Sequence, residues 1–309
     1  MTRSVVTIGN FDGVHLGHAA ILERARRVAD RRGAVLKALT FEPHPATILR
    51  PDSVPPRIVD RDEKLRLLRE GGADEVIVMK PDAALLALDP AAFVERMVET
   101  HRPHAFVEGR DFRFGRDRRG DIAMLSDAGP GMDFVVEVVD PVEITLSDQL
   151  VARASSSLAR WLIARGRVRD AALCLGRPVT LTGEVVEGDR RGRTIGVPTA
   201  NLDRRSLDGL VIPADGVYAG HARLTDGRVR AAAISIGIKP TFKGALRCVE
   251  AHLLDFDGDL YGQTVSLSAL RWVRDQVRFA NTEDLRAQLT RDVDATRDLW
   301  LERASAAGG

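Results

Sequence analysis

Two histidines in the pattern His-x-Gly-His are the side chains of this sequence that most directly indicate chemistry. His15 and His18 flank Gly17 in the stretch GNFDGVHLGH, residues 9–18. A predicted strand precedes this stretch and a predicted helix follows it, so free backbone N–H groups and a positive helix end favour phosphate there. Ordinary packing is the alternative for a single histidine, whereas two around one glycine favour phosphate binding. We expect further phosphate contacts from this loop at Gly9, Asn10, Phe11, Asp12, Gly13 and Gly17.

Two other polar segments carry candidate ligands. The serines of the segment 153–160, RASSSLAR, lie at the start of a predicted helix, where they either cap the helix or hold a phosphate. The segment 192–201, GRTIGVPTAN, joins a glycine-rich turn to Pro-Thr-Ala-Asn. The Thr199 hydroxyl and the Asn201 carbonyl can supply the hard oxygen ligands that Mg²⁺ prefers in a kinase without a P-loop. An ordinary turn is the alternative for this second segment.

The elements that must position the histidine motif alternate between strands and helices over residues 1–178. Short β-branched runs predict strands, and amphipathic stretches predict helices. The predicted strands are 4–8, 34–41, 75–79, 104–107 and 134–139, and the predicted helices are 19–31, 62–69 and 90–100. This alternation predicts a parallel sheet with helices on both faces. Ligands of such a sheet bind beyond the carboxyl ends of its strands, where the histidine motif lies.

The pattern changes after residue 178 to short alternating runs that are interrupted by glycines. We predict strands at 179–186, 216–224, 229–236, 248–254 and 264–272. They indicate an antiparallel barrel or sandwich. An amphipathic helix is predicted at 282–300, with Asn281 as its N-cap and an acidic first turn. The predicted fold class is therefore α/β followed by all-β, in two domains, 1–178 and 179–309.

Composition excludes several classes of protein. Of the 309 residues, 44% are hydrophobic and 29% are charged, as in globular proteins. The 45 basic and 44 acidic side chains leave a net charge of +1, so we expect neither nucleic acid nor a membrane as a partner. We predict no membrane span and no export signal, because apolar runs are too short. Cys174 and Cys248 lack zinc or redox spacing, which favours a reducing cytoplasm.

The motifs together resemble those of the bacterial bifunctional riboflavin kinase/FMN adenylyltransferases, or FAD synthetases. TFEPHP at 40–45, GRDFRFG at 109–115 and the serine-rich segment follow the histidine motif in family order. Segments that resemble the family's kinase barrel lie at 192–201, 213–218, 235–242, 248–252 and 259–262. The sequence departs from the family pattern at Ala154, Ser157, Val197 and Lys239. For His44, between two prolines, both a structural role and a ligand contact stay open.

This resemblance implies two activities on one chain. It implies an N-terminal Rossmann-like nucleotidyltransferase domain that adenylylates FMN to FAD with ATP and releases pyrophosphate. It also implies a C-terminal antiparallel β-barrel of riboflavin kinase type, closed by the terminal helix, that phosphorylates riboflavin to FMN and releases ADP. The expected partners are riboflavin, FMN, FAD, ATP, ADP and pyrophosphate, with Mg²⁺ as cofactor. We expect a monomer or a weak homo-oligomer.

The resemblance also implies roles for individual residues. His15, His18 and Arg160 would neutralise the charge that develops on the phosphates of ATP during adenylyl transfer. Glu250 would be the general base that takes the proton from the ribityl 5′-hydroxyl. Thr199 and Asn201 would hold Mg²⁺. The remaining implied contacts are to phosphate at Arg153, Ser156, Ser157, Gly192, Gly196 and Pro198, and to flavin at Asp111, Phe112 and Arg274.

Two alternatives compete with this interpretation. The first half could be a nucleotidyltransferase of another specificity, such as a cytidylyltransferase, because the histidine motif is shared across that superfamily. The segments 40–45 and 109–115 argue against it. The barrel could instead be a flavin-binding regulatory module, and the presence of Thr199, Asn201 and Glu250 together argues against that.

Overall fold

The computed structural model describes residues 3–188, 197–241 and 244–307. The chain divides into two compact units, Met1–Thr145 with Gln149–Ser156, and Leu146–Asp148 with Ser157–Gly309. Residues 157–178 thus pack with the second unit. Compactness assigns no activity to these residues, so the functional division at residue 178 stays a prediction.

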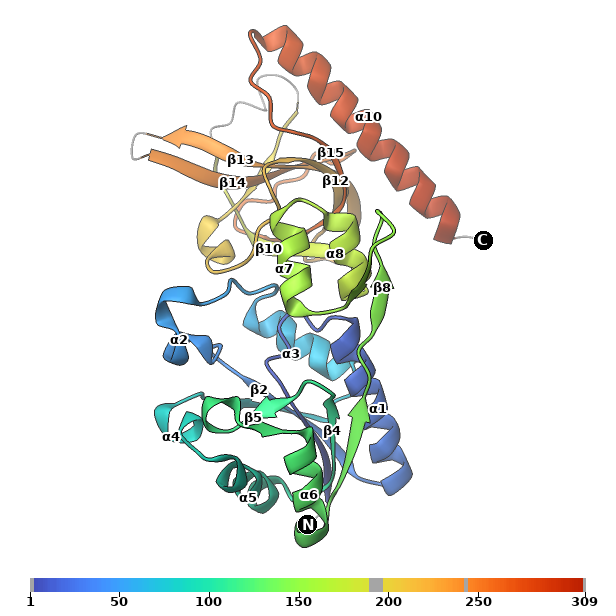
Figure 1. Ribbon diagram of the computed structural model, residues 1–309. Helices are drawn as coiled ribbons and strands as arrows, with labels where there is room; N and C mark the ends of the chain where they lie inside the picture. The colour runs from blue at the N-terminus through green and yellow to red at the C-terminus, as the bar shows by residue number, and fades with distance from the viewer. Residues whose placement is uncertain (1–2, 189–196, 242–243, 308–309) are drawn as a thin grey trace. The chain divides into compact units, whose positions relative to one another are not determined.

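The first unit is built on a five-stranded parallel sheet with the strand order β3-β2-β1-β4-β7 (Figure 1). Its strands are β1 (Ser4–Ile8), β2 (Val35–Phe41), β3 (Glu75–Met79), β4 (Pro103–Gly109) and β7 (Val135–Val139). All five residues of β1 are buried, as expected for the central strand of a sheet covered on both faces. The predicted parallel sheet is confirmed.

Helices cover both faces of this sheet. On one face, α1 (Leu16–Arg32) and α3 (Arg61–Glu70) pack on a core that includes Val5 and Leu36. On the other face, α4 (Ala83–Leu86), α5 (Pro90–His101) and α6 (Ile122–Met132) pack on Val6 and Phe106. The remaining elements of this unit are α2 (Ala46–Leu49), η1 (Pro51–Ser53), β5 (Arg113–Phe114), η2 (Arg116–Arg118), β6 (Gly120–Asp121), β8 (Glu143–Thr145) and β9 (Val151–Arg153).

The second unit is a closed antiparallel barrel with the strand order β10-β11-β14-β13-β12-β15. Its strands are β10 (Val179–Val186), β11 (Ala200–Leu202), β12 (Gly216–Arg223), β13 (Val229–Thr241), β14 (Gly244–Leu253) and β15 (Thr264–Arg274). Along β14, Val249 and Ala251 are buried in the barrel core, so Glu250 and His252, which alternate with them, lie on the outer face. The structure therefore has a barrel rather than a sandwich.

Helices flank this barrel. The unit also contains α7 (Ser156–Ala164), α8 (Val168–Leu175) and η3 (Arg204–Leu207), and α8 packs on β10 and β15. The terminal helix α10 (Thr282–Ala307) packs on β12 and β13 and extends past the predicted end at residue 300. Asn281 caps it as predicted, since its Oδ1 accepts from Asp284 N–H at 2.8 Å. None of the described helices combines the length and the apolar composition that a bilayer crossing requires.

Candidate functional site

Three of the sequence motifs meet at one edge of the parallel sheet. The histidine motif follows β1, residues 42–45 follow β2 and residues 110–115 follow β4. Because β1 lies between β2 and β4 and all three are parallel, the histidine motif emerges between the other two loops. The order of connections reverses at β1, and open α/β sheets bind their ligands at such a point.

The two histidines lie against each other at the start of α1. Their rings stack with centroids 3.7 Å apart and an interplanar angle of 27°. His15 is the N-cap residue of α1, and its Nδ1 accepts a hydrogen bond from Gly17 N–H at 3.1 Å. The ring of Phe11 meets His18 edge-on at 5.1 Å. The structure therefore aligns the predicted pair with the positive end of a helix.

Burial keeps His18 neutral in the free protein. Its pKa lies well below the ordinary value, first because the ring is buried and second because His15 is beside it. Nδ1 of His18 is buried and has no hydrogen-bond partner among the described residues. A buried ring nitrogen without a protein partner is suited to a ligand that supplies one.

The loop around these histidines depends on Gly13, Asp12 and Ser156. Gly13 has φ +77°, and a Cβ there would lie 2.8 Å from the side chain of Ile58. Asp12 is 6% exposed, and its Oδ1 accepts from Ile58 N–H at 3.0 Å. Ser156 Oγ donates to the carbonyl of Asp12 at 2.8 Å. Asp12 and Ser156 thus hold the shape of the loop, and a direct phosphate contact by either stays a prediction.

The other predicted phosphate ligands differ in their placement. Phe11 is 1% exposed and belongs to the core beneath the loop, and Gly9 lies against its ring. Asn10 is exposed at the pocket described below, and Arg153 is exposed at the end of β9. Ser157 and Arg160 lie on α7 and belong to the second unit, so their approach to the histidines stays a prediction.

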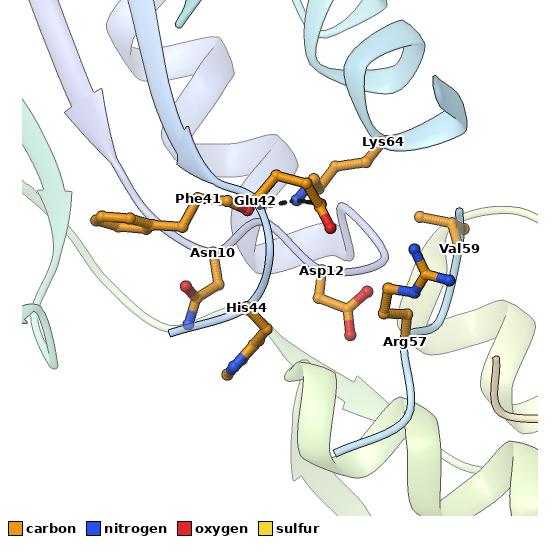
Figure 2. Close-up of a pocket in the computed structure, with 8 residues that line it drawn as sticks. All are labelled: Asn10, Asp12, Phe41, Glu42, His44, Arg57, Val59 and Lys64. Carbon is orange, nitrogen blue, oxygen red and sulfur yellow. Dashed lines mark hydrogen bonds and ion pairs between the residues drawn. The ribbon is translucent and has the colours of Figure 1, made fainter. Parts of the chain in front are cut away.

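A pocket opens beside the histidine loop (Figure 2). It is lined by Asn10, Asp12, Phe41, Glu42, His44, Arg57, Val59 and Lys64. Lys64 donates to Glu42 Oε2 and to the carbonyl of Phe41, both at 2.9 Å. Sequence analysis missed both Arg57 and Lys64. Lys64 lies in the charged stretch 61–70, and such a stretch is typical of a solvent-exposed helix face.

The loop after β4 provides an aromatic surface and a buried acid. Asp111 is exposed, whereas the half-buried ring of Phe112 stacks with Phe114 at 5.5 Å. Glu108, which sequence analysis did not single out, is 2% exposed, and its Oε1 accepts from Ile8 N–H at 2.7 Å. Burial raises the pKa of Glu108 well above its ordinary value. The flavin contacts of Asp111 and Phe112 stay predictions.

The barrel brings its candidate residues together across three strands. In the strand register, Glu250 lies opposite Asn201 on β11 and opposite Ser235 on β13, so the three side chains share the outer face. Asn201 Nδ2 donates to the carbonyl of Thr199 at 3.3 Å. A Cβ on Gly188 would lie 2.6 Å from the amide of Asn201, so Gly188 allows this close approach. Sequence analysis missed Gly188.

These residues fit a bound Mg²⁺. The hydroxyl of Thr199 and the amide oxygen of Asn201 are hard oxygen donors, which Mg²⁺ takes together with substrate phosphates. No cluster of three or more His, Cys, Asp or Glu side chains suited to a metal occurs within the described ranges. A magnesium site at the oxygen donors around β11 stays a prediction. Gly192 and Gly196 lie outside the described residues.

Two further residues of the barrel have clear structural partners. His252 Nδ1 lies 2.8 Å from the carbonyl of Pro198 and so ties β14 to the Pro-Thr-Ala-Asn segment. Arg274 forms a bidentate ion pair with Asp292 of α10, at 2.9 and 2.7 Å, with side chains that are 18% and 3% exposed. Arg274 thus fastens the terminal helix to the end of β15, and its predicted flavin contact stays a prediction.

Comparison with known proteins matches both halves of the chain. The family model described as FAD synthetase matches residues 1–153, and that described as riboflavin kinase matches residues 175–300. The bifunctional riboflavin kinase/FMN adenylyltransferase of Haemophilus influenzae is 35% identical, with 94% of this chain and 92% of the relative covered. The enzyme of the same name from Escherichia coli K12 is also 35% identical, covering 96% and 92%. That of Bacillus subtilis is 31% identical, covering 94% and 90%.

One solved structure also matches nearly the whole chain. The crystal structure of a protein described as a macrolide-efflux protein from Streptococcus pneumoniae matches with a TM-score of 0.87 at 32% identity, over 96% of this chain and 94% of that one. Both family models and the named relatives agree on a flavin enzyme with two parts. On this evidence of sequence over nearly its whole length, the chain belongs to the bifunctional riboflavin kinase/FMN adenylyltransferase family.

Proposed function

We propose that the two units divide the two reactions of the family between them. The barrel phosphorylates riboflavin with ATP, which gives FMN and ADP. The parallel-sheet unit adenylylates FMN with a second ATP, which gives FAD and pyrophosphate. One observation carries this division: each unit has its own set of residues suited to phosphate chemistry. The first unit has the stacked histidines, and the barrel has Asn201 and Glu250, which lie opposite each other on neighbouring strands.

Adenylyl transfer needs alignment and charge stabilisation rather than a covalent enzyme intermediate. A phosphate oxygen of FMN attacks the α-phosphorus of ATP, and the bond to the departing pyrophosphate breaks. His15, His18 and the N–H groups at the start of α1 support the ATP phosphates. Arg160 adds positive charge to the same phosphates. Arg153, Ser157 and the backbone of residues 9–13 complete the proposed phosphate contacts.

We assign the pocket beside the histidine loop to FMN. ATP would bind at the two histidines. FMN, which accepts the adenylyl group, must then reach the α-phosphorus of ATP from an adjacent site. The pocket shares Asn10 and Asp12 with the histidine loop. Phe41 lines the pocket and packs on the same hydrophobic cluster as Phe112, so an aromatic surface continues toward the predicted flavin contacts. A flavin ring is suited to such a surface.

In the barrel, Glu250 acts as the general base. It takes the proton from the ribityl 5′-hydroxyl as that oxygen attacks the γ-phosphorus of ATP, and the bond to ADP breaks. Thr199 and Asn201 hold Mg²⁺, which when bound neutralises charge on the phosphate oxygens. Gly188 and His252 hold the segment that carries these two ligands.

The wider setting of the protein follows from the same assignments. ATP and the flavins are its partners, and the net charge of +1 supports no nucleic-acid partner. Neither Cys174 nor Cys248 forms a disulfide within the described ranges, which supports a reducing compartment such as the cytoplasm. A monomer or a weak homo-oligomer is the oligomeric state that we propose.

Two variants test the division of labour. We expect Glu250→Gln to stop FMN formation from riboflavin while the protein still converts supplied FMN to FAD. We expect His18→Asn to stop the conversion of FMN to FAD while the protein still forms FMN from riboflavin. In each variant, the reaction that remains shows that the unmutated unit is folded. Loss of both reactions in a folded variant, or equal use of CTP and ATP with FMN, would contradict the assignment.

A further inference from the structure

Lys64 is a buried cation whose partners lie at the end of a neighbouring strand. It is 7% exposed, although it comes from the charged helix α3. Its Nζ donates to the carbonyl of Phe41 and to Glu42 Oε2, both at 2.9 Å (Figure 2). A lysine is seldom buried unless it is paired, because taking a charge out of water costs free energy. The buried pair therefore fixes the position of Glu42 and of the Phe41 carbonyl relative to α3.

The partners of Lys64 begin the loop that forms one wall of the pocket. β2 ends at Phe41, and Glu42 N–H donates to the carbonyl of Met79 at 3.1 Å. The loop then continues to His44, whose Nδ1 accepts from Ala46 N–H at 3.0 Å. Lys64 thus holds the first two residues of this loop, and the loop's own hydrogen bonds hold the next ones.

Each wall of the pocket is tied by one polar side chain to the backbone of a neighbouring loop. Thr40 Oγ1 donates to the carbonyl of Asn10 at 3.1 Å. Asp12 Oδ1 accepts from Ile58 N–H at 3.0 Å. Lys64 makes the third such tie, to Phe41 O. The three ties fix the loops after β1 and β2 and the segment before α3 against one another.

We propose that Lys64 is a positioning residue for adenylyl transfer, which holds the loop after β2, through Glu42 and the Phe41 carbonyl, in the place that receives FMN. This inference rests on the proposed function of the pocket. Lys64 acts through its partners, because Glu42 neutralises its charge and two of its three N–H groups are engaged. A loosened loop weakens FMN binding more than it slows a bound FMN that is correctly aligned.

Steady-state kinetics of full-length variants tests this proposal. We expect Lys64→Met to raise the KM for FMN about tenfold or more, the scale of a lost charge-assisted interaction, with kcat and the KM for ATP changed by less than about threefold. Lys64→Arg should restore much of the affinity, since guanidinium also pairs with carboxylate. Glu42→Gln should raise the KM for FMN as well, whereas a direct contact between Lys64 and FMN predicts no rise for Glu42→Gln.

Lys37 provides a matched control. Lys37 pairs with Glu75 at 3.4 Å between the same strand β2 and its neighbour β3, near the end of β2 opposite to the site. Lys37→Met should leave both reactions unchanged. Circular dichroism reports whether the first unit of each variant is folded, because riboflavin phosphorylation by the same chain reports only on the barrel unit. If Lys64→Met disturbs folding, the double variant Lys64→Met/Glu42→Leu, which leaves no unpaired charge, decides the question by its KM for FMN.

The outcomes separate this inference from the function on which it rests. A wild-type KM for FMN in folded Lys64→Met, or in the double variant, overturns the role of Lys64 alone. An equal rise of the KM for FMN in Lys37→Met overturns it too, because the effect would then not be specific to the lysine beside the pocket. Wild-type protein that makes no FAD from FMN overturns the proposed function as well.

Discussion

At the scale of single residues, the stacked histidines explain how a buried motif can receive a triphosphate. His18 is kept neutral by burial and by His15, so the free site holds no uncompensated buried charge. Bound phosphate reverses this balance, because a nearby negative charge favours the protonated ring. The site thereby gains positive charge only when its ligand arrives.

We therefore predict that ATP binding is accompanied by proton uptake at pH values just below the ordinary pKa of histidine, about 6.5. The pKa of His18 is lowered in the free protein and rises in the complex, so the bound state holds more protons between the two values. Calorimetric titration of ATP in buffers of different ionisation enthalpy should show an uptake of up to about one proton. The uptake should be smaller in His18→Asn, and identical values in both proteins would contradict this account.

Glu108 leads to a second prediction on pH. Its folded pKa is raised by burial, so its contribution to stability is present at low pH and is lost as pH rises through that raised pKa. Glu108→Gln keeps an oxygen for Ile8 N–H and cannot ionise. We expect the variant to unfold at the same urea concentration as wild type at pH 4, below the ordinary pKa of Glu, and at a higher urea concentration than wild type at pH 8.

Circular dichroism would follow this unfolding of the first unit. Tryptophan fluorescence is an internal control, because Trp161, Trp272 and Trp300 all belong to the second unit. A variant that is less stable than wild type at pH 8 would show that Glu108 is needed in its charged form.

At the scale of elements, the terminal helix depends on one buried ion pair. Arg274→Met leaves the carboxylate of Asp292, 3% exposed, without its guanidinium. We predict a loss of about 3–5 kcal/mol in the free energy of unfolding of the barrel unit, measured by tryptophan fluorescence in urea. Arg297→Met is the control, since its pair with Asp255 is exposed and contributes less than about 1 kcal/mol. Equal losses would contradict this role for Arg274.

Sequence patterns identified the long elements of this fold and missed those without a pattern of their own. β1, β3 and β10 match their predicted ranges, because each is marked by a short run rich in β-branched residues. β11 was missed because three residues are too short to alternate visibly. α6 was missed because Pro130 lies inside it, between two glycines, and these residues normally end a helix.

The candidate sites show the same limit. The histidine pair was within reach of sequence analysis because it is a short motif, whereas Glu250 was identified only through the family resemblance and its pairing with Asn201 was missed together with β11. Lys64 was not within reach, because its partner Glu42 comes from another element and the residue itself resembles a solvent-exposed charge. Gly188 likewise owes its importance to a contact with Asn201, which only the folded barrel reveals.

At the scale of the whole molecule, two folds with separate phosphate chemistry are joined in one chain. The parallel sheet offers a helix N-terminus and a switch point for nucleotides, whereas the barrel offers an outer face with oxygen ligands and a base. The product of the barrel, FMN, is the substrate of the sheet. In the proposed division, two sites in one chain would perform consecutive reactions without any residue serving both.

The most direct test of this account is a time course of the purified protein with riboflavin, ATP and Mg²⁺, in which riboflavin, FMN and FAD are separated by chromatography. We predict that FMN forms first and that FAD follows as FMN accumulates. FMN without FAD, even when FMN is supplied, would contradict the role of the histidine site. No FMN from riboflavin would contradict the role of Glu250 and the barrel.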